Sequence, residues 1–240
     1  MGDIVIEDVE IPVDNGKINL IGSIYYTKET PVKAPWVITL AGLGYSRNGK
    51  FVRSFSEKFA NANYYVLSYD YRGHGDTAKQ TGKNWYKFIT EMYSDIHDAI
   101  TWVLETQKER LLDEKIALFG RSIGGAIILT HGFIDKRAKK LIALVTRYDY
   151  ASYTALKFSD EKIKKVSPKY FLEKDPSNND RILIAHCKDD ERIPFHNLQL
   201  IKEKLDLSEK NVIAYETGGH SFRGNRENIF NEAIRFLERD

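Results

Sequence analysis

The sequence is poor in several features that mark particular classes of protein. Its 240 residues include one cysteine, Cys187, so no disulfide can form within the chain. No apolar run approaches the ~20 residues of a membrane-spanning helix, and the first residues lack the basic and apolar regions of a signal peptide. A net charge of +2 gives no reason to expect a nucleic acid as partner. We therefore expect a cytoplasmic protein without a membrane span or a nucleic-acid partner.

Patterns typical of metal sites and of domain linkers are missing as well. The six histidines and the carboxylates show no spacing such as H-x-x-x-H, so we expect no metal and no cofactor. Neither an internal repeat nor a low-complexity linker divides the chain. We expect a single domain over residues 1–240, which is long enough to bury a large core. The sequence leaves a monomer and a homodimer open.

What is present is an N-terminal hairpin followed by alternating strand and helix patterns. Residues 4–13 and 17–26 are rich in β-branched residues, and Asn15-Gly16 between them favours a tight turn. Further apolar runs predict strands at residues 36–40, 64–69, 115–119, 141–145, 181–186 and 212–215. Helical spacing predicts helices at residues 51–61, 88–107, 194–205 and 229–237, and another after residue 124. The fold class is therefore α/β, with a mostly parallel twisted sheet of about eight strands and helices on both faces.

A serine between two glycines lies where one strand meets the next helix. Residues 120–124 read Gly-Arg-Ser-Ile-Gly, which is the G-x-S-x-G pattern of a nucleophile elbow. The sharp turn would project the Ser122 hydroxyl into a cleft, and the glycines would let strand and helix pass close together. The helix would aim its first N–H groups at the reacting centre. Because so short a motif also arises by chance, a catalytic role for Ser122 requires a base and an acid elsewhere.

The best candidate for the base is His220. It follows the last predicted strand in the segment Glu-Thr-Gly-Gly-His-Ser-Phe, at the sheet edge where ligands bind in such folds. The alternative is a solvent-exposed loop histidine. An acid should lie between the serine and the histidine, because this elbow uses the order serine, acid, histidine. Asp189 and Asp190 both follow the strand at residues 181–186, and spacing alone does not choose between them.

An oxyanion site needs two backbone N–H donors that point at the developing negative charge. Ile123 supplies one by the geometry of the elbow. The segment Ala-Gly-Leu-Gly at residues 41–44 follows the first predicted parallel strand and could bring a second. A glycine-rich loop could instead hold a phosphate, but this one lacks the lysine and the spacing of a P-loop.

These motifs together resemble the α/β-hydrolase superfamily, nearest to compact esterases of the serine aminopeptidase and monoacylglycerol lipase type. Residues 186–194, His-Cys-Lys-Asp-Asp-Glu-Arg-Ile-Pro, resemble the family's H-G-x-x-D-x-x-V-P, and residues 70–75 match its D-x-R-G-H-G. The resemblance implies the α/β-hydrolase fold, Asp190 as the acid and Leu43 as the second oxyanion donor.

The resemblance also implies a structural role for residues 70–75, in which Arg72 and His74 hold neighbouring loops. The sequence departs from the family pattern twice. Cys187 replaces a glycine after His186, and Ala41 stands where relatives often have histidine.

Residues 148–179 break the strand–helix alternation and take the place of the family's cap over the acyl pocket. The segment is rich in aromatic residues, and Tyr148 and Tyr153 are candidates for substrate binding. The alternative is that these rings only pack the segment against the sheet. We expect a short cap insertion rather than a separate domain.

The sequence thus predicts a serine hydrolase that acts on small-molecule esters or other acyl compounds, in the manner of a carboxylesterase. Ser122 is the expected nucleophile, with His220 and Asp190 completing the triad. Two alternatives stay open. One is a thioesterase or acyl-peptidase with the same triad, and the other is a non-catalytic binding protein on this fold.

Overall fold

A computed structural model describes residues 2–153 and 157–239, and in this part of the chain eight strands form one sheet. The strands are β1 (Ile4–Val13), β2 (Ile18–Thr27), β3 (Ala34–Leu40), β4 (Tyr65–Tyr69), β5 (Leu111–Arg121), β6 (Ala138–Leu144), β7 (Ile182–Cys187) and β8 (Val212–Tyr215). Their order is β1-β2-β4-β3-β5-β6-β7-β8. The pairs β1/β2 and β2/β4 are antiparallel and all others are parallel. The predicted mostly parallel sheet is confirmed.

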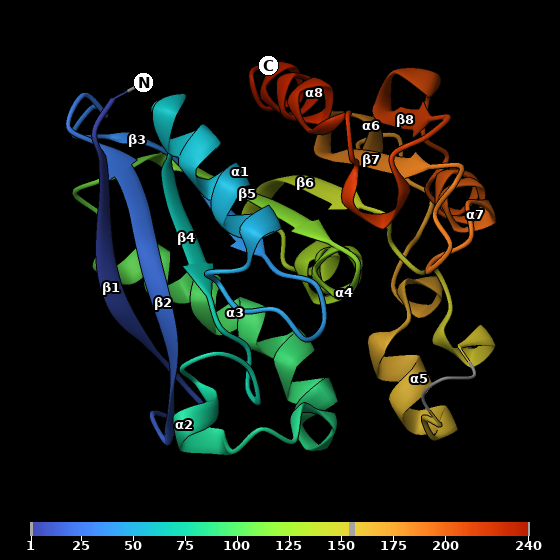
Figure 1. The fold of residues 1–240 in the computed structure, drawn as a ribbon, viewed down its shortest axis with the longest axis horizontal. Coiled ribbons are helices and arrows are strands. Elements are labelled where there is room, and N and C mark those ends of the chain that lie inside the picture. Colours follow the sequence, from blue (N-terminus) through green and yellow to red (C-terminus); the bar gives the residue numbers. More distant parts are fainter. Residues whose placement is uncertain (1, 154–156, 240) are drawn as a thin grey trace.

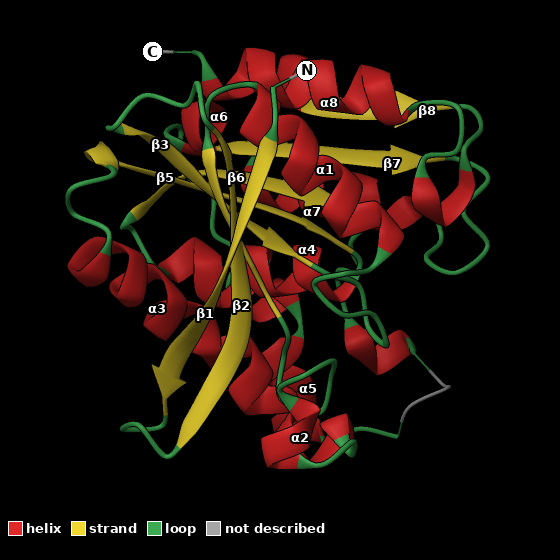
Figure 2. Ribbon diagram, turned by 60° about the vertical axis from the view of Figure 1, so that its left-hand side comes forward, coloured by secondary structure: helices red, strands yellow, loops and turns green. Residues whose placement is uncertain are grey.

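Helices cover both faces of this sheet, as Figure 2 shows. They are α1 (Lys50–Asn61), α2 (Ala78–Thr81), α3 (Ile89–Thr106), α4 (Ile123–Ile127), α5 (Asp160–Val166), α6 (Asn178–Arg181), α7 (His196–Leu205) and α8 (Arg226–Leu237). Helix α4 continues as one wider turn, Ile128–Gly132. In the described part of the chain, no helix is both long and apolar enough to cross a membrane.

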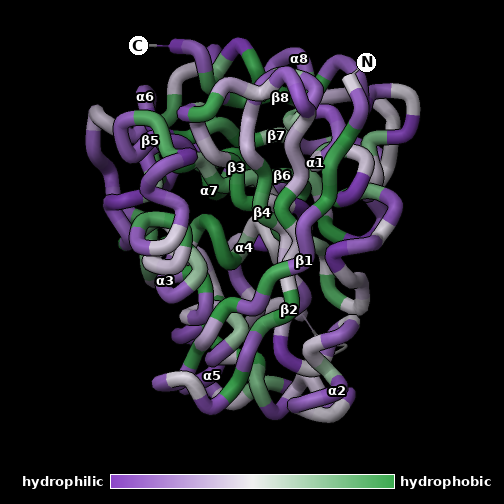
Figure 3. Tube along the Cα trace, turned by 90° about the vertical axis from the view of Figure 1, so that its left-hand side faces the viewer, coloured by the Kyte–Doolittle hydropathy of each residue, from purple (hydrophilic) through white to green (hydrophobic). Residues whose placement is uncertain are grey.

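The core lies in two layers, one on each face of the sheet. Helices α1 and α8 cover one face, where Phe55 and Phe59 of α1 contact Phe119 of β5 at ring-centre distances of 4.8 and 5.2 Å. Helices α3, α4 and α7 cover the other. Burying one such phenylalanine contributes about 2–3 kcal/mol. Figure 3 shows hydrophobic residues along the inner strands and hydrophilic ones at the periphery. The sheet and the helices packed on it hold the strand ends that carry the site.

The segment between β6 and β7, where the sequence predicts an insertion, lies beyond the carboxyl edge of the sheet, around α5 in Figure 1. Residues 154–156 of the predicted 148–179 insertion lie outside the described residues. The insertion contacts the loop before α3, because the Tyr86 hydroxyl donates to the Lys157 carbonyl at 2.6 Å and the rings of Tyr86 and Phe158 stack. It therefore closes one side of the space above the strand ends.

Candidate active site

Ser122 occupies a strained turn between β5 and α4. Its φ of 60° and ψ of −117° lie in a region that residues with a side chain rarely adopt, and such strain is typical of active sites. The two neighbouring glycines permit the turn: a Cβ on Gly120 would lie 2.8 Å from the backbone of Gly124, and one on Gly124 would lie 2.6 Å from the Leu40 carbonyl oxygen. The segment has the geometry of a nucleophile elbow.

His220 and Asp190 are hydrogen-bonded to each other. His220 lies in the short turn Gly219–Ser221 after β8, and its Nδ1 is 2.8 Å from Oδ2 of Asp190, which follows β7. The other carboxylate oxygen of Asp190 accepts the backbone N–H groups of Arg192 and Ile193 at 2.8 and 3.1 Å. Asp190 is therefore fixed at the orienting nitrogen of the imidazole, which leaves Nε2 for proton transfer.

The neighbouring carboxylate, Asp189, has a different role. It accepts the N–H groups of Gly218 and Gly219 at 3.0 and 2.7 Å, so it holds the loop that carries His220 rather than the imidazole itself. The structure places Asp190, and not Asp189, against His220, a choice that spacing alone left open.

Electrostatics keep Asp190 ionised. Burial by itself raises the pKa of this carboxyl group, but the hydrogen bond and charge of His220 and the two backbone N–H donors outweigh it and lower the pKa below its ordinary value. A carboxylate held in this way can stabilise the imidazolium that forms when His220 accepts a proton.

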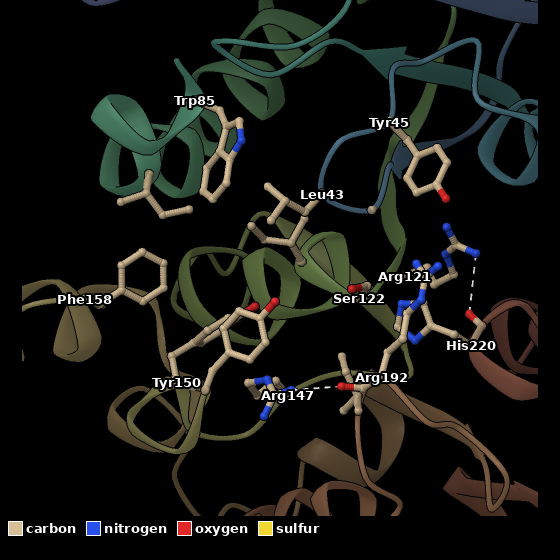
Figure 4. Close-up of a pocket in the computed structure, with 15 residues that line it drawn as sticks. Leu43, Tyr45, Trp85, Arg121, Ser122, Arg147, Tyr150, Phe158, Arg192 and His220 are labelled. Atoms are coloured by element: carbon tan, nitrogen blue, oxygen red, sulfur yellow. Dashed lines mark hydrogen bonds between the residues drawn. The ribbon is translucent and has the colours of Figure 1, made fainter. Parts of the chain in front are cut away.

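Ser122 and His220 line one cavity of about 180 Å³ (Figure 4). Within residues 2–153 and 157–239, the Ser122 hydroxyl has no hydrogen-bond partner, so the last link of the triad is open here. Catalytic hydrogen bonds are often long before substrate binds. The observation that bears on a catalytic pair is that Ser122 and His220 line the same cavity.

Two backbone N–H groups at this cavity are free to bind an oxyanion. Those of Leu43 and Ile123 donate to no acceptor in the described part of the chain. Both residues line the cavity beside Ser122, Leu43 from the loop after β3 and Ile123 from the start of α4. The positions expected from the sequence are therefore the ones that present unused donors.

The loop after β4 supports the loop that carries Leu43. His74 Nε2 accepts the Gly44 N–H at 3.1 Å, and the Tyr71 hydroxyl donates to the Ala41 carbonyl at 2.9 Å. The adjacent Arg72 is buried and bonds both oxygens of Asp95 on α3 at 2.8 and 2.7 Å. His74 thus has the loop-holding role expected of it, whereas Arg72 ties its own loop to helix α3 rather than to a neighbouring loop.

Cys187, the departure from the family pattern, is fully buried at the end of β7. Burial raises the pKa of its thiol to about 12. Its Sγ would lie 3.0 Å from a Cβ on Gly218, so the larger side chain fits because the facing loop has a glycine there. The turn before Asp190 is kept despite the substitution.

The substrate end of the cavity differs from the candidates chosen by sequence. Tyr153 lines the cavity, whereas Tyr148 does not belong to its lining and instead donates its backbone N–H to Asn197. Tyr150, Phe158 and Trp85 complete an aromatic wall, which Figure 4 shows at the opposite end from His220. The sequence did not single out Trp85, because nothing in the loop before α3 marks it.

Sequence reasoning also missed two arginines. Arg121 and Arg147 both line the cavity. Arg121 is the variable residue of the elbow motif, and Arg147 lies in the loop after β6 at the carboxyl edge of the sheet. Their positions at strand ends were a usable signal, since ligands bind at this edge.

Comparisons with known proteins agree with this geometry. A family model described as serine aminopeptidase S33 matches residues 36–181, more than half of the chain. An uncharacterised 31.7 kDa protein of Escherichia coli, from the traX-finO intergenic region, is 27% identical over 124 residues. That match covers 51% of this chain but only 41% of the relative, so the aligned part is less than half of the longer protein.

Solved structures show the same fold at low identity. Est1E from Butyrivibrio proteoclasticus, with ferulic acid bound, is 18% identical over 95% of this chain and 97% of its own, with a TM-score of 0.76. The acylaminoacyl peptidase of Pyrococcus horikoshii is 18% identical over 98% of this chain and 41% of its own, with a TM-score of 0.74. Fold and motifs agree with the resemblance seen in the sequence, and the chain belongs to the serine aminopeptidase S33 family with an α/β-hydrolase fold.

Proposed function

We propose that this chain hydrolyses carboxylic esters through an acyl-enzyme on Ser122. The observation that carries the proposal is the hydrogen bond between His220 and the buried Asp190, at a cavity shared with the strained serine and two free N–H donors. A serine hydroxyl is a weak nucleophile until a base takes its proton, and this arrangement supplies such a base.

The reaction follows from these positions. His220 Nε2 takes the proton of Ser122 as Oγ attacks the ester carbonyl, and Asp190 stabilises the imidazolium. The N–H groups of Leu43 and Ile123 bind the oxyanion of the tetrahedral intermediate. His220 then gives its proton to the leaving alcohol. Water, activated by the same histidine, releases the acid and restores the serine.

An ester is favoured over a peptide by the size of the site. The cavity of about 180 Å³ suits a small acyl compound, and the short insertion leaves little wall for an extended chain. The family and the fold also include peptidases, so hydrolysis of an acyl-peptide or a thioester by the same groups is the second candidate. The chemistry at Ser122 would be the same in each case.

The test is hydrolysis of para-nitrophenyl esters from acetyl to long acyl by the wild type and by Ser122→Ala. We expect turnover of the short esters, and its loss in the variant. A fluorophosphonate probe, which reacts quickly only with an activated serine, should label the wild type alone. Absence of both turnover and labelling in a folded protein would refute the proposal, whereas labelling without ester turnover would favour a thioester or an acyl-peptide.

A further inference from the structure

Four arginine side chains in the described part of the chain are more than nine-tenths buried, and they fall into two pairs. Arg47 and Arg72 each bond a buried carboxylate, Asp70 at 2.5 Å and Asp95 at 2.7 Å. Burying a charge is costly unless a partner of opposite sign accompanies it. These two arginines satisfy that requirement within the chain.

The other two buried arginines, Arg121 and Arg147, lack a carboxylate partner in the described residues. Neither lies within 4.0 Å of a carboxylate oxygen in residues 2–153 or 157–239. Arg121 donates to the Ser221 hydroxyl at 2.7 Å, so part of its guanidinium holds the loop of His220. Within residues 2–153 and 157–239, Arg147 donates to one carbonyl only, that of Arg192 at 3.0 Å, and its guanidinium carbon lies 4.6 Å from the ring centre of Tyr153. Most donors of Arg147 therefore have no partner in the part of the chain that the structure describes.

The backbone before Arg147 is strained. Val145 has a φ of 43°, and a β-branched residue rarely adopts a positive φ. Its N–H donates to the Ala185 carbonyl of β7 at 2.8 Å, which fixes the turn. The turn leads the chain from β6 to the cavity wall, where Arg147 lies (Figure 4). Strain of this kind collects at functional sites, and here it lies two residues before Arg147.

The lining of the cavity favours a negative ligand. Arg121, Arg147 and Arg192 all contribute to it, and none of its described lining residues is acidic. Trp85 and Phe158, which Figure 4 shows away from Arg121 and His220, add apolar surface. A ligand that satisfies both kinds of lining residue carries an anionic group and an apolar or aromatic body. The volume of about 180 Å³ limits that body to a small one.

We propose that Arg147 binds a carboxylate of the substrate, so that the preferred substrate is a small ester that carries a free carboxylate. The proposal rests on ester hydrolysis at Ser122. A guanidinium presents two parallel N–H groups that match the two oxygens of a carboxylate, and such charge-assisted pairs are strong when water is excluded. The ligand thus supplies the partner that Arg147 lacks within the chain.

Two pairs of matched esters test this. In the first pair, the para-nitrophenyl half-ester of glutarate is compared with para-nitrophenyl pentanoate, which replaces the carboxylate by a methyl group. In the second, ortho-nitrophenyl acetate is compared with its counterpart bearing a carboxylate on the leaving-group ring. Background hydrolysis is measured with Ser122→Ala. For wild type, we expect kcat/KM of the charged member to exceed that of the neutral member about tenfold in at least one pair.

The variants then assign the preference. In Arg147→Gln, the ratio of charged to neutral kcat/KM should fall about tenfold, to near one. Arg147→Lys should give an intermediate ratio, since a lysine keeps the charge without the paired donors. The matched control, Arg192→Gln, removes the same charge from an exposed residue of the cavity wall and should change the ratio less than about threefold.

The outcomes separate this proposal from the proposed function. Turnover without a charged preference in either pair, or a preference that Arg147→Gln leaves intact, would overturn the carboxylate site and leave ester hydrolysis standing. Without turnover of any ester, calorimetry on Ser122→Ala with monomethyl glutarate decides. Binding that Arg147→Gln weakens tenfold supports the site, and equal or absent binding refutes it. If Arg147→Gln does not fold, the wild-type preference and the Arg147→Lys variant give the answer.

Discussion

The loops that surround the cavity are held in two different ways. Those after β3, β4, β7 and β8, which carry or support Leu43, Asp190 and His220, are tied by buried charged groups such as Asp70 and Asp190. The segment between β6 and β7 is tied by ring contacts, such as Tyr150 with Phe158, and by exposed pairs, such as Lys169 with Asp149. Charged ties are directional, whereas ring contacts tolerate shifts. The groups proposed for chemistry are thus fixed, and the wall proposed for the substrate body can adapt.

The largest effect is expected among the residues that buried charged groups hold in place. We expect Asp190→Asn to lower kcat about a thousandfold to ten-thousandfold, because an amide cannot fix the imidazole in the working tautomer. Asp189→Asn should cost less than about tenfold, since it only loosens the loop of Gly218 and Gly219. Steady-state kinetics on a short para-nitrophenyl ester measure both. Losses of similar size, or in the reverse order, would mean that the acid has been assigned to the wrong residue.

A matched pair of carboxylates compares the two regions in stability. Asp70, whose side chain is fully buried, accepts the backbone N–H groups of Arg47 and Asp76 as well as the Arg47 guanidinium. Asp70→Asn removes the one fully buried carboxylate beside that guanidinium, leaving the more exposed Asp76 and Asp8, and should lower the free energy of unfolding by about 2–3 kcal/mol.

The counterpart in the insertion is Asp149, which pairs with the exposed Lys169. Asp149→Asn should change the free energy of unfolding by less than about 1 kcal/mol, because water screens the pair and an asparagine can still accept the Ala151 N–H. Urea unfolding followed by circular dichroism measures both variants. Equal losses would contradict the division into two regions.

One ring contact of the insertion is sensitive to pH. His131 packs against Phe171 at 5.3 Å, and burial, with a smaller contribution from His97, lowers its pKa to about 4. A histidine in the unfolded chain takes its proton near pH ~6.5. The stability that neutral His131 provides is therefore complete above that pH and is lost as the pH falls toward 4.

This loss should amount to about 1–2 kcal/mol after allowance for solvent screening. It is measured as the change in unfolding free energy between pH 7 and pH 4. His131→Gln should flatten the dependence, while His196→Gln, which changes an exposed histidine, should leave it as in the wild type. A curve that His131→Gln does not alter would refute the assignment.

The smallest effect is expected at the aromatic wall itself. Phe158→Ala removes a ring that stacks on Tyr86 and faces the cavity, and should raise KM for a short aryl ester about threefold to tenfold with little change in kcat. Tyr170→Ala truncates a half-exposed ring of the same segment outside the cavity and should leave KM unchanged. A fall in kcat without a change in KM would mean that Phe158 acts with the fixed groups proposed for chemistry, and not in binding the substrate body.

Much of this architecture could be predicted from the sequence, because apolar strand runs and the elbow motif are local signals. The α/β-hydrolase fold follows from them. The extent of β5 could not be predicted: the strand begins at Leu111 and passes through Asp113 and Glu114, whose positive φ values mark an irregularity. Leu111 pairs with Ala34 and Ile116 with Trp36, so these charged residues lie in an irregularity of the β3–β5 pairing that the apolar pattern does not mark.

Some residues of the candidate site could be predicted from the sequence, and others could not. Chain order pointed to Ser122 and His220, and the structure brings both to one cavity, but spacing could not separate Asp189 from Asp190. That choice depends on which carboxylate the turn after β7 directs inward. Arg147 could not be found by motif at all, because the absence of a buried partner is a property of the folded chain.

The burial of Cys187 has a practical consequence. Its thiol is protonated and fully enclosed beneath the loop of His220, so alkylating reagents cannot reach it in the folded state. As the chain has no other cysteine, each labelled molecule must have opened at this place. The labelling rate under native conditions therefore reports how often the end of β7 separates from the loop of His220. The protein's own thiol thus reports the opening of the loop that carries His220.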